Sequence, residues 1–155
     1  MNFDDDETIL DGPGNRPAPD SALPQGFRLG DYEIERLLGA GAMGEVYLAR
    51  QVRLNQRCAL KVLPAALAQS ADFEKRFASE GQALAMLDHP NVVRVLNAGE
   101  DKGRHFLTME YVEGGSLEEH LAERGGRLPE ADARKMLVQI LSGLAYAHKA
   151  GVVHR

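Results

Sequence analysis

Five short segments of the chain are predicted to be β-strands from their apolar, β-branched and aromatic residues, and alternation of apolar and polar residues is clearest in the first of them. In the first segment, residues 31–38, Tyr32 and Ile34 alternate with Glu33 and Glu35. A period of two places successive side chains on opposite faces, so that one face of each strand can be buried. The other four strands are predicted at residues 45–50, 57–63, 92–98 and 105–110. Because turn residues join most consecutive strands, the five are expected to form one antiparallel sheet.

A long segment between the third and fourth strands has the spacing of an α-helix instead. Residues 70–87 repeat large apolar side chains along one face, namely Phe73, Phe77, Leu84 and Leu87. Glu80 falls on the same stripe, three residues after Phe77. A carboxylate buried on an apolar stripe needs a partner, whereas one at its rim could remain in water.

Two further helices are predicted near the end of the sequence. Ser116 suits the N-cap of a short helix at residues 117–124. A longer helix is expected from about Pro129 or Glu130 to Ala150, with Gly151 as its C-terminal stop. Its apolar stripe consists of Ala133, Met136, Leu137, Ile140, Leu141, Leu144 and His148. We expect this stripe to be exposed unless another part of the protein or another chain covers it.

The first 30 residues differ in composition from the rest of the chain. The net charge of −5 is accounted for by five acids, because the other 18 acidic residues balance the 18 basic ones. These five are Asp4, Asp5, Asp6, Glu7 and Asp11. Four of the seven prolines follow between residues 12 and 30, in a composition that cannot bury enough apolar surface to fold. Residues 1–30 are therefore predicted to be a disordered tail, and the balanced charge elsewhere gives no support to nucleic-acid binding.

Several other functional classes receive no support from the sequence. No apolar run is long enough to span a membrane, and the start of the chain has no cationic leader, so we expect a cytoplasmic protein with no membrane segment in this chain. The single cysteine, Cys58, cannot form an internal disulfide, and we interpret it as a packed strand residue rather than a reactive thiol. The five histidines lack the spacing of metal ligands, so no metal site is predicted.

The candidate chemistry lies between residues 38 and 61. Gly39, Gly41 and Gly44 form the pattern G-x-G-x-x-G, in which missing Cβ atoms let backbone N–H groups approach an anionic ligand. In a dinucleotide-binding fold a helix would begin at these glycines, but the residues that follow them alternate like a strand. The next strand carries a single cation, Lys61, which a bound phosphate would explain. Alternatively, the glycines form a plain hairpin turn and Lys61 is a solvated strand end.

These motifs together resemble those of protein kinases. The run from Gly39 to Val46, G-x-G-x-x-G-x-V, followed by Ala59-Leu60-Lys61, is similar to the glycine-rich loop and third-strand lysine of that family. Residues 109–117, Met-Glu-Tyr-Val-Glu-Gly-Gly-Ser-Leu, add a resemblance to bacterial serine/threonine kinases of the eukaryotic, or Hanks, type.

The resemblance implies an α+β fold in two parts. Residues 31–110 would form a kinase N-lobe, with a five-stranded antiparallel sheet and one long helix. Residues 111–155 would contain the hinge and the first helices of an incomplete C-lobe. The implied activity is transfer of a phosphoryl group from ATP to serine or threonine hydroxyls of a protein substrate.

The same resemblance assigns roles to individual residues. Lys61 and Glu80 would be the catalytic ion pair that aims the lysine at the α- and β-phosphates. Met109 would be the gatekeeper at the back of the pocket, and the backbones of Glu110 and Val112 would bind the adenine edge. The implied nucleotide-binding residues are Leu38, Gly39, Ala40, Gly41, Ala42, Met43, Gly44, Glu45, Val46, Ala59, Lys61, Met109, Glu110 and Val112.

The last residues, Val152-Val153-His154-Arg155, resemble the start of the kinase catalytic loop, H-R-D-x-x-x-x-N, and stop before its aspartate. That aspartate, and the asparagine and aspartate that hold Mg²⁺ in the family, are not among residues 1–155. We therefore expect these residues on their own not to phosphorylate protein, and expect the ligands of Mg²⁺ to lie outside them.

Two alternatives accompany the kinase interpretation. The chain could be a nonenzymatic module that binds a nucleotide or a partner without phosphoryl transfer. In the tail, Thr8 and Asp11 have the Thr-x-x-Asp spacing of ligands of phosphothreonine-binding forkhead-associated domains. An uninvolved threonine in an acidic tail is the simpler interpretation of that spacing.

Overall fold

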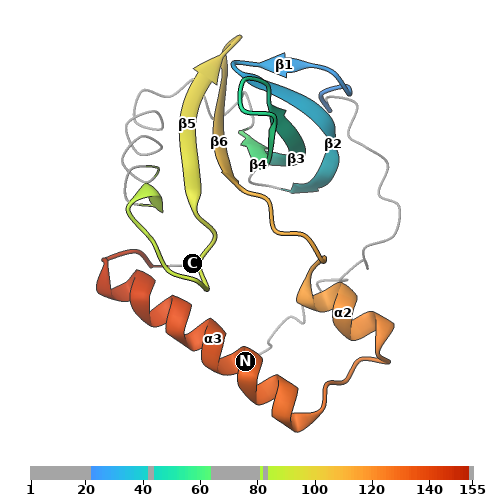
Figure 1. Cartoon of the computed structure of the whole chain (residues 1–155), viewed down its shortest axis with the longest axis vertical. Coiled ribbons are helices and arrows are strands. Elements are labelled where there is room, and N and C mark those ends of the chain that lie inside the picture. Colours follow the sequence, from blue (N-terminus) through green and yellow to red (C-terminus); the bar gives the residue numbers. More distant parts are fainter. Residues whose placement is uncertain (1–21, 42–43, 64–80, 82–83, 154–155) are drawn as a thin grey trace, which may run out of the picture.

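The computed structural model describes residues 22–41, 44–63, 81 and 84–153. Within these residues an antiparallel sheet of six strands curls around a core, and two complete helices follow it (Figure 1). The strands are β1 (Arg28–Leu29), β2 (Tyr32–Gly41), β3 (Gly44–Gln51), β4 (Gln56–Val62), β5 (Val95–Asp101) and β6 (Arg104–Glu110). The helices are α2 (Leu117–Glu123) and α3 (Glu130–Lys149). The strand order across the sheet is β1-β2-β3-β4-β6-β5.

The antiparallel sheet is confirmed, but it has six strands where the sequence predicts five. β1 escapes the prediction because two residues are too few to show a period. β5 begins at Val95 rather than at residue 92, since residues 88–92 form a turn that packs on α3. β5 and β6 are joined by a tight turn in which Lys102 and Gly103 both have positive φ, 52° and 68°, as in a type I′ hairpin.

The fold begins before residue 31, which corrects the predicted boundary of the tail. Leu23 is 8% exposed and Leu29 is fully buried. Phe27 packs against the same core, and its carbonyl accepts a hydrogen bond from Ile34 N–H at 2.9 Å. This segment contains one proline and two glycines, but its three large apolar residues, Leu23, Phe27 and Leu29, decide its structure because they bury surface in the sheet core.

One face of the sheet carries the buried core. Tyr47 of β3, Leu60 of β4 and Thr108 of β6 are paired across neighbouring strands, and all three are fully buried. Thr108 Oγ1 donates to the hydroxyl of Tyr32 at 3.4 Å, so this polar side chain has a partner inside the core. The other core members are Leu23, Leu29, Tyr32, Ile34, Ala49, Cys58, Val62 and Phe106. Each large apolar side chain buried in this way stabilises the fold by about 1.5–3 kcal/mol.

The two complete helices have the ends that the sequence predicts to within one residue. Ser116 caps α2: its hydroxyl accepts from Glu119 N–H at 3.1 Å, and the Glu119 carboxylate accepts from Ser116 N–H at 2.6 Å. Pro129 occupies the N-cap of α3, so Glu130 is the first helical residue. Gly151 has φ +82° immediately after the C-cap, a conformation that glycine adopts without strain.

Much of the predicted helix at residues 70–87 lies outside the described residues. Its later residues Gly81, Leu84 and Ala85 are helical, and Leu87 is buried after the helix ends. In the part of the chain that the structure describes, no helix combines the length and apolar character needed to cross a membrane.

The turn at residues 88–92 packs against α3 and joins the sheet to the helices. The His89 ring stacks on Tyr146 with 5.1 Å between ring centroids, and its Nε2 lies 3.1 Å from Ser142 Oγ. Gly143 is the buried residue of α3, and a Cβ there would lie 2.7 Å from the carbonyl oxygen of Asn91. The missing side chain at Gly143 therefore sets how closely the turn can approach the helix.

Candidate functional site

The face of the sheet opposite the core brings several predicted site residues together. Directly paired residues on antiparallel strands point to the same face. The register pairs Val46 of β3 with Lys61 of β4, and pairs Lys61 with Leu107 of β6. The next row on this face consists of Leu48, Ala59 and Met109. Three strands thus place a cation and a mainly apolar surface side by side.

The glycine-rich turn connects β2 to β3 at the end of this surface. It is flanked by strands on both sides, so the expected strand–turn–strand arrangement is confirmed and a helix at the glycines is excluded. Gly39 pairs with Val46, which places the turn in line with the row that contains Lys61. Leu38 and Ala40, also on β2, are exposed. Ala42 and Met43 lie outside the described residues.

The three glycines of the turn have different physical roles. A Cβ at Gly39 or Gly41 would meet no atom within 4 Å, so their backbone faces open space that an anionic ligand could enter. Gly44 instead packs against β4: its φ is +108°, and a Cβ there would lie 2.2 Å from the carbonyl oxygen of Val62. Gly44 is therefore required by the close approach of two strands, while the other two leave room for a ligand.

The predicted ion pair between Lys61 and Glu80 remains a prediction, because Glu80 lies outside the described residues. Its neighbour in sequence, Gly81, is helical and buried. A Cβ on Gly81 would lie 3.5 Å from Leu107 Cδ2, and Leu107 is the register partner of Lys61. Gly81 therefore lies against the face of the sheet that carries Lys61.

The predicted hinge begins where β6 ends. Met109 pairs with Ala59 on the site face, and Glu110 is the last residue of β6. The N–H of Glu110 donates to Arg94 O at 3.0 Å, and its carboxylate accepts from Arg94 N–H at 3.2 Å, so the end of the strand is held from the β5 side. Val112 has left the sheet and is 62% exposed.

Burial raises the pKa of two side chains on the core face. The pKa of the Cys58 thiol rises to about 11, because burial and then the nearby Glu35 carboxylate disfavour the thiolate. This supports the interpretation of Cys58 as a packed residue, since the thiolate is the reactive form. The pKa of Tyr47 rises to about 12, through burial and a hydrogen bond to Glu45, so its hydroxyl keeps its proton.

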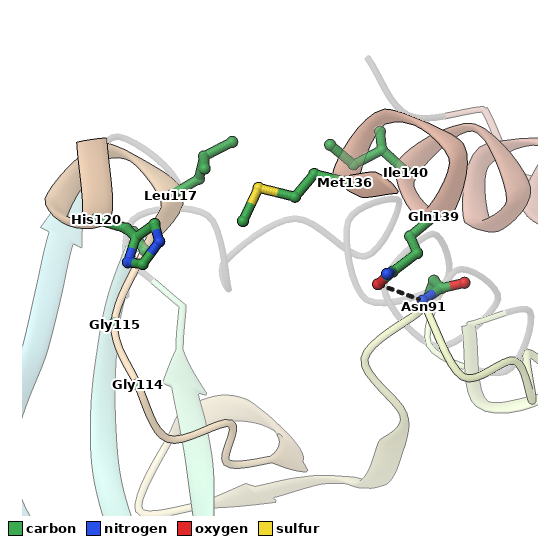
Figure 2. Close-up of a pocket in the computed structure, with 9 residues that line it drawn as sticks. Asn91, Gly114, Gly115, Leu117, His120, Met136, Gln139 and Ile140 are labelled. Carbon is green, nitrogen blue, oxygen red and sulfur yellow. Dashed lines mark hydrogen bonds between the residues drawn. The ribbon is translucent and has the colours of Figure 1, made fainter. Parts of the chain in front are cut away.

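Beyond the hinge, α2 and α3 border a cavity of about 380 Å³ (Figure 2). Its lining residues are Asn91, Gly114, Gly115, Ser116, Leu117, His120, Met136, Gln139 and Ile140. Figure 2 shows Leu117 and Met136 projecting into the space between the two helices, with the Asn91–Gln139 hydrogen bond at one side. This cavity lies on the helical side of the hinge and does not include Lys61. Among the described residues, no cluster of three or more His, Cys, Asp or Glu side chains could hold a metal ion.

Comparison with known proteins agrees with this geometry. The family model described as protein kinase domain matches residues 32–155. The chain belongs to the protein kinase family. Ten residues at the start of the described kinase structure, 22–31, thus lie ahead of the matched region.

Named relatives and solved structures place the chain among bacterial serine/threonine kinases. It is 44% identical to the serine/threonine-protein kinase PknJ of Mycobacterium tuberculosis, over 86% of this chain and 22% of the relative. It is 39% identical to PrkC of Bacillus subtilis, over 81% of this chain and 19% of the relative. A crystal structure of the M. tuberculosis PknI kinase domain superimposes with a TM-score of 0.74 at 36% identity, covering 86% of this chain and 54% of that one. The chain therefore spans about a fifth of its curated relatives.

Two residues on the site face of the kinase sheet are absent from the sequence-based prediction. Leu48 is 4% exposed and pairs with Ala59, while Leu107 pairs with Lys61. Their alternation marks them as strand residues but does not say which strand lies beside which. Once Val46 is aligned with Lys61, counting two residues along each strand would identify Leu48.

Proposed function

We propose that the full-length protein transfers the γ-phosphoryl group of ATP to serine or threonine hydroxyls of protein substrates. The observation that carries the proposal is the row that places Lys61 between Val46 and Leu107, in line with the open backbone of the glycine turn. A single cation beside an open, glycine-lined space suits a phosphate chain. The named relatives are serine/threonine kinases, which supports hydroxyl groups of proteins as acceptors.

Each part of the site has a role that follows from its position. The open backbone at Gly39 and Gly41 covers the phosphates. Lys61 contacts the α- and β-phosphates, and Glu80, the residue before Gly81, orients Lys61. The apolar row of Leu48, Ala59 and Met109 accommodates the flat adenine ring, whose edge is recognised by the hinge backbone at Glu110 and Val112. ATP supplies the transferred group, and the family uses it with Mg²⁺.

The proposal is tested with the full-length protein, labelled ATP and a generic basic protein as acceptor. Lys61→Met should lower phosphate transfer by about a hundredfold to a thousandfold, as expected when one preorganised charge on the reacting group is lost. Lys135→Met makes the same chemical change at an exposed position of α3 and should leave transfer unchanged. Nucleotide binding without any transfer, in both the wild type and this control, would instead support the nonenzymatic module.

Two finer points of the proposal concern location and partners. We place the kinase domain in the cytoplasm, where ATP is available. Phosphorylated Thr8, with Asp11, would attract a phosphothreonine-binding domain; both residues lie outside the described part of the chain. A peptide of residues 1–21 phosphorylated at Thr8 should bind such a domain, and an Asp11→Ala peptide should bind less well.

A further inference from the structure

Residues 22–30, which we call the strap, cross the sheet ahead of the region matched by the kinase family. β1 lies within the strap and pairs antiparallel with β2, Arg28 opposite Glu33 and Leu29 opposite Tyr32. Leu29 is fully buried, so the strap is anchored by apolar contact as well as by backbone pairing. The strap is therefore a structural part of the lobe that carries the candidate nucleotide site.

The C-terminal end of the strap is hydrogen-bonded to the end of β5 and to the β5–β6 turn. Gly30 N–H donates to the Asp101 carboxylate at 2.8 Å, and Lys102 Nζ donates to Arg28 O at 2.6 Å. Lys102 also lies 4.5 Å from the centre of the Phe27 ring, within reach of a cation–π contact. Asp101 is the last residue of β5 and Lys102 lies in the β5–β6 turn, and β5 is the edge strand opposite β1. Figure 1 shows β1 beside the ends of β5 and β6.

The other end of the strap reaches the strand that leaves the glycine turn. Leu23 N–H donates to the Tyr47 hydroxyl at 2.8 Å. The same hydroxyl donates a short hydrogen bond to the carboxylate of Glu45, the residue that follows Gly44. Because the oxygen accepts from the strap on one side, its proton is directed to Glu45 on the other. Tyr47 thereby links the strap to the first residues of β3.

The hydrogen bonds of Tyr47 can influence the site face because successive side chains of β3 point to opposite faces of the sheet. Glu45 and Tyr47 point to the core face, and Val46 between them points to the face that carries Lys61. Fixing the two neighbours fixes the backbone of Val46 and the exit of the glycine turn. A displacement of Glu45 would also displace its neighbour Gly44, whose backbone packs against Val62.

We propose that Tyr47 is a positioning residue for the glycine-rich turn, and that the strap holds its hydroxyl in place for that role. The inference rests on the proposed function, which assigns the turn to ATP. Tyr47 does not touch the nucleotide in this proposal; it acts through Glu45 and the backbone of β3. A merely structural Tyr47 would stabilise the sheet without any selective effect on ATP.

The test compares two buried tyrosines of the same core in the full-length protein. Tyr47→Phe removes the hydroxyl between Leu23 and Glu45 and keeps the ring. Tyr32→Phe is the matched control, because its hydroxyl bonds to Asn97 and Thr108 instead. Tyr47→Phe removes two hydrogen bonds and should raise the KM for ATP about fivefold, with little change in kcat, because only part of their net effect reaches the glycine-rich turn. Tyr32→Phe should leave the KM for ATP unchanged.

Two truncations test the strap itself. A protein that begins at Ala22 keeps Leu23 and should behave like the full-length protein. One that begins at Gln25 loses the donor to Tyr47 and should show the raised KM. Adding Tyr47→Phe to it should have little further effect, because without the Leu23 N–H the hydroxyl no longer holds Glu45 in place. Equal KM values in the two truncations, or equal effects of the two tyrosine substitutions, would overturn the proposal.

Hydrogen exchange separates this inference from the proposed function. Tyr47→Phe should speed exchange of the backbone amides of residues 44–46, and Tyr32→Phe should not. That result supports the positioning role even if the full-length protein fails to transfer phosphate. Unchanged exchange in an active kinase would reject the role of Tyr47 while leaving the proposed function intact.

Discussion

The sheet buries most of its apolar residues within the described part of the chain, whereas α3 leaves most of its own exposed. Tyr47 and Leu60 in the sheet are fully buried, while Leu137 and Leu141 on α3 are each 54% exposed. The expected exposure of the α3 stripe is thus confirmed for Leu137, Ile140 and Leu141, whereas Met136 and Leu144 are half-buried. The contrast shows that the sheet has its own core, while α3 has an apolar face still available for contact.

The contact between the two regions is correspondingly small and specific. It includes the turn at residues 88–92, whose His89 stacks on Tyr146 and whose Asn91 meets Gly143. Among the described residues, the position of α3 relative to the sheet therefore depends on a glycine and a few polar side chains rather than on a large apolar interface. For this reason, substitutions in the sheet and in α3 should change the free energy of unfolding by different amounts, and in some cases in opposite directions.

The largest expected effect is a core substitution in the sheet. In a polypeptide of residues 1–155, Leu60→Ala should lower the free energy of unfolding by about 2–5 kcal/mol, because it leaves a cavity in the core. Leu141→Ala makes the same chemical change on α3 and should cost less than about 1 kcal/mol, because the side chain is half exposed. Urea unfolding measures both.

The same two substitutions in the full-length protein show whether another part of the protein covers α3. A much larger cost for Leu141→Ala there than in residues 1–155 would show that another part of the protein covers α3. Equal small costs in both would mean that this face remains open. A large cost for Leu141→Ala already in residues 1–155 would contradict the exposure seen in the structure.

The second prediction concerns the joint at Gly143. Glycine to alanine inside a helix normally stabilises it by about 1 kcal/mol. At Gly143 the sign should reverse, because the new Cβ would lie 2.7 Å from the Asn91 carbonyl oxygen, and relieving such overpacking costs about 1–3 kcal/mol. Thermal unfolding followed by circular dichroism measures the change. A stabilised Gly143→Ala variant would show that the turn does not pack tightly on α3.

A smaller effect is expected at the start of α2. Ser116→Ala removes the hydroxyl that accepts from Glu119 N–H and should cost about 1 kcal/mol, the usual value of an N-cap. Ser116→Asp keeps an acceptor and should retain most of the stability. Equal losses for the two variants in urea unfolding would argue against a capping role.

The smallest expected effect is the pH dependence of stability that comes from the Tyr47 hydroxyl. At neutral pH this contribution does not vary, because the hydroxyl keeps its proton in both the folded and the unfolded state. Its folded pKa of about 12 lies above the ordinary value of 10.0. The unfolded chain therefore loses this proton first, and the stability gained from the protonated hydroxyl is complete below pH 10 and is lost as the pH rises through 12. The difference in unfolding free energy between wild type and Tyr47→Phe should be constant below pH 10 and should shift against the wild type above it.

Local patterns were enough to predict much of the sheet and both complete helices. Alternation between Tyr32 and Glu35 identifies β2, because strand pleating imposes a period of two whatever the partner. Ser116 and Gly151 mark helix ends through hydrogen bonding and backbone freedom within a few residues. The strand–turn–strand arrangement around the glycines could be predicted for the same reason, because it depends only on neighbouring residues.

Other features depend on residues far apart in the sequence and escape local patterns. The strap has the composition of a tail, and its order depends on contacts of Leu23 with Tyr47 and of Gly30 with Asp101. The late start of β5 follows from the packing of the preceding turn on α3. Leu48 and Leu107 join the site only because the register places them beside Ala59 and Lys61.

The sequence by itself determined where most of the strands, both complete helices and the glycine turn lie along the chain, and which single cation accompanies the turn. These are properties of neighbouring residues, fixed by backbone geometry and side-chain spacing. Only the tertiary structure decided that the strap belongs to the sheet, that Lys61 shares a row with Val46 and Leu107, and that Gly143 sets the approach of the turn to α3. These depend on close packing between distant segments, which no local period records.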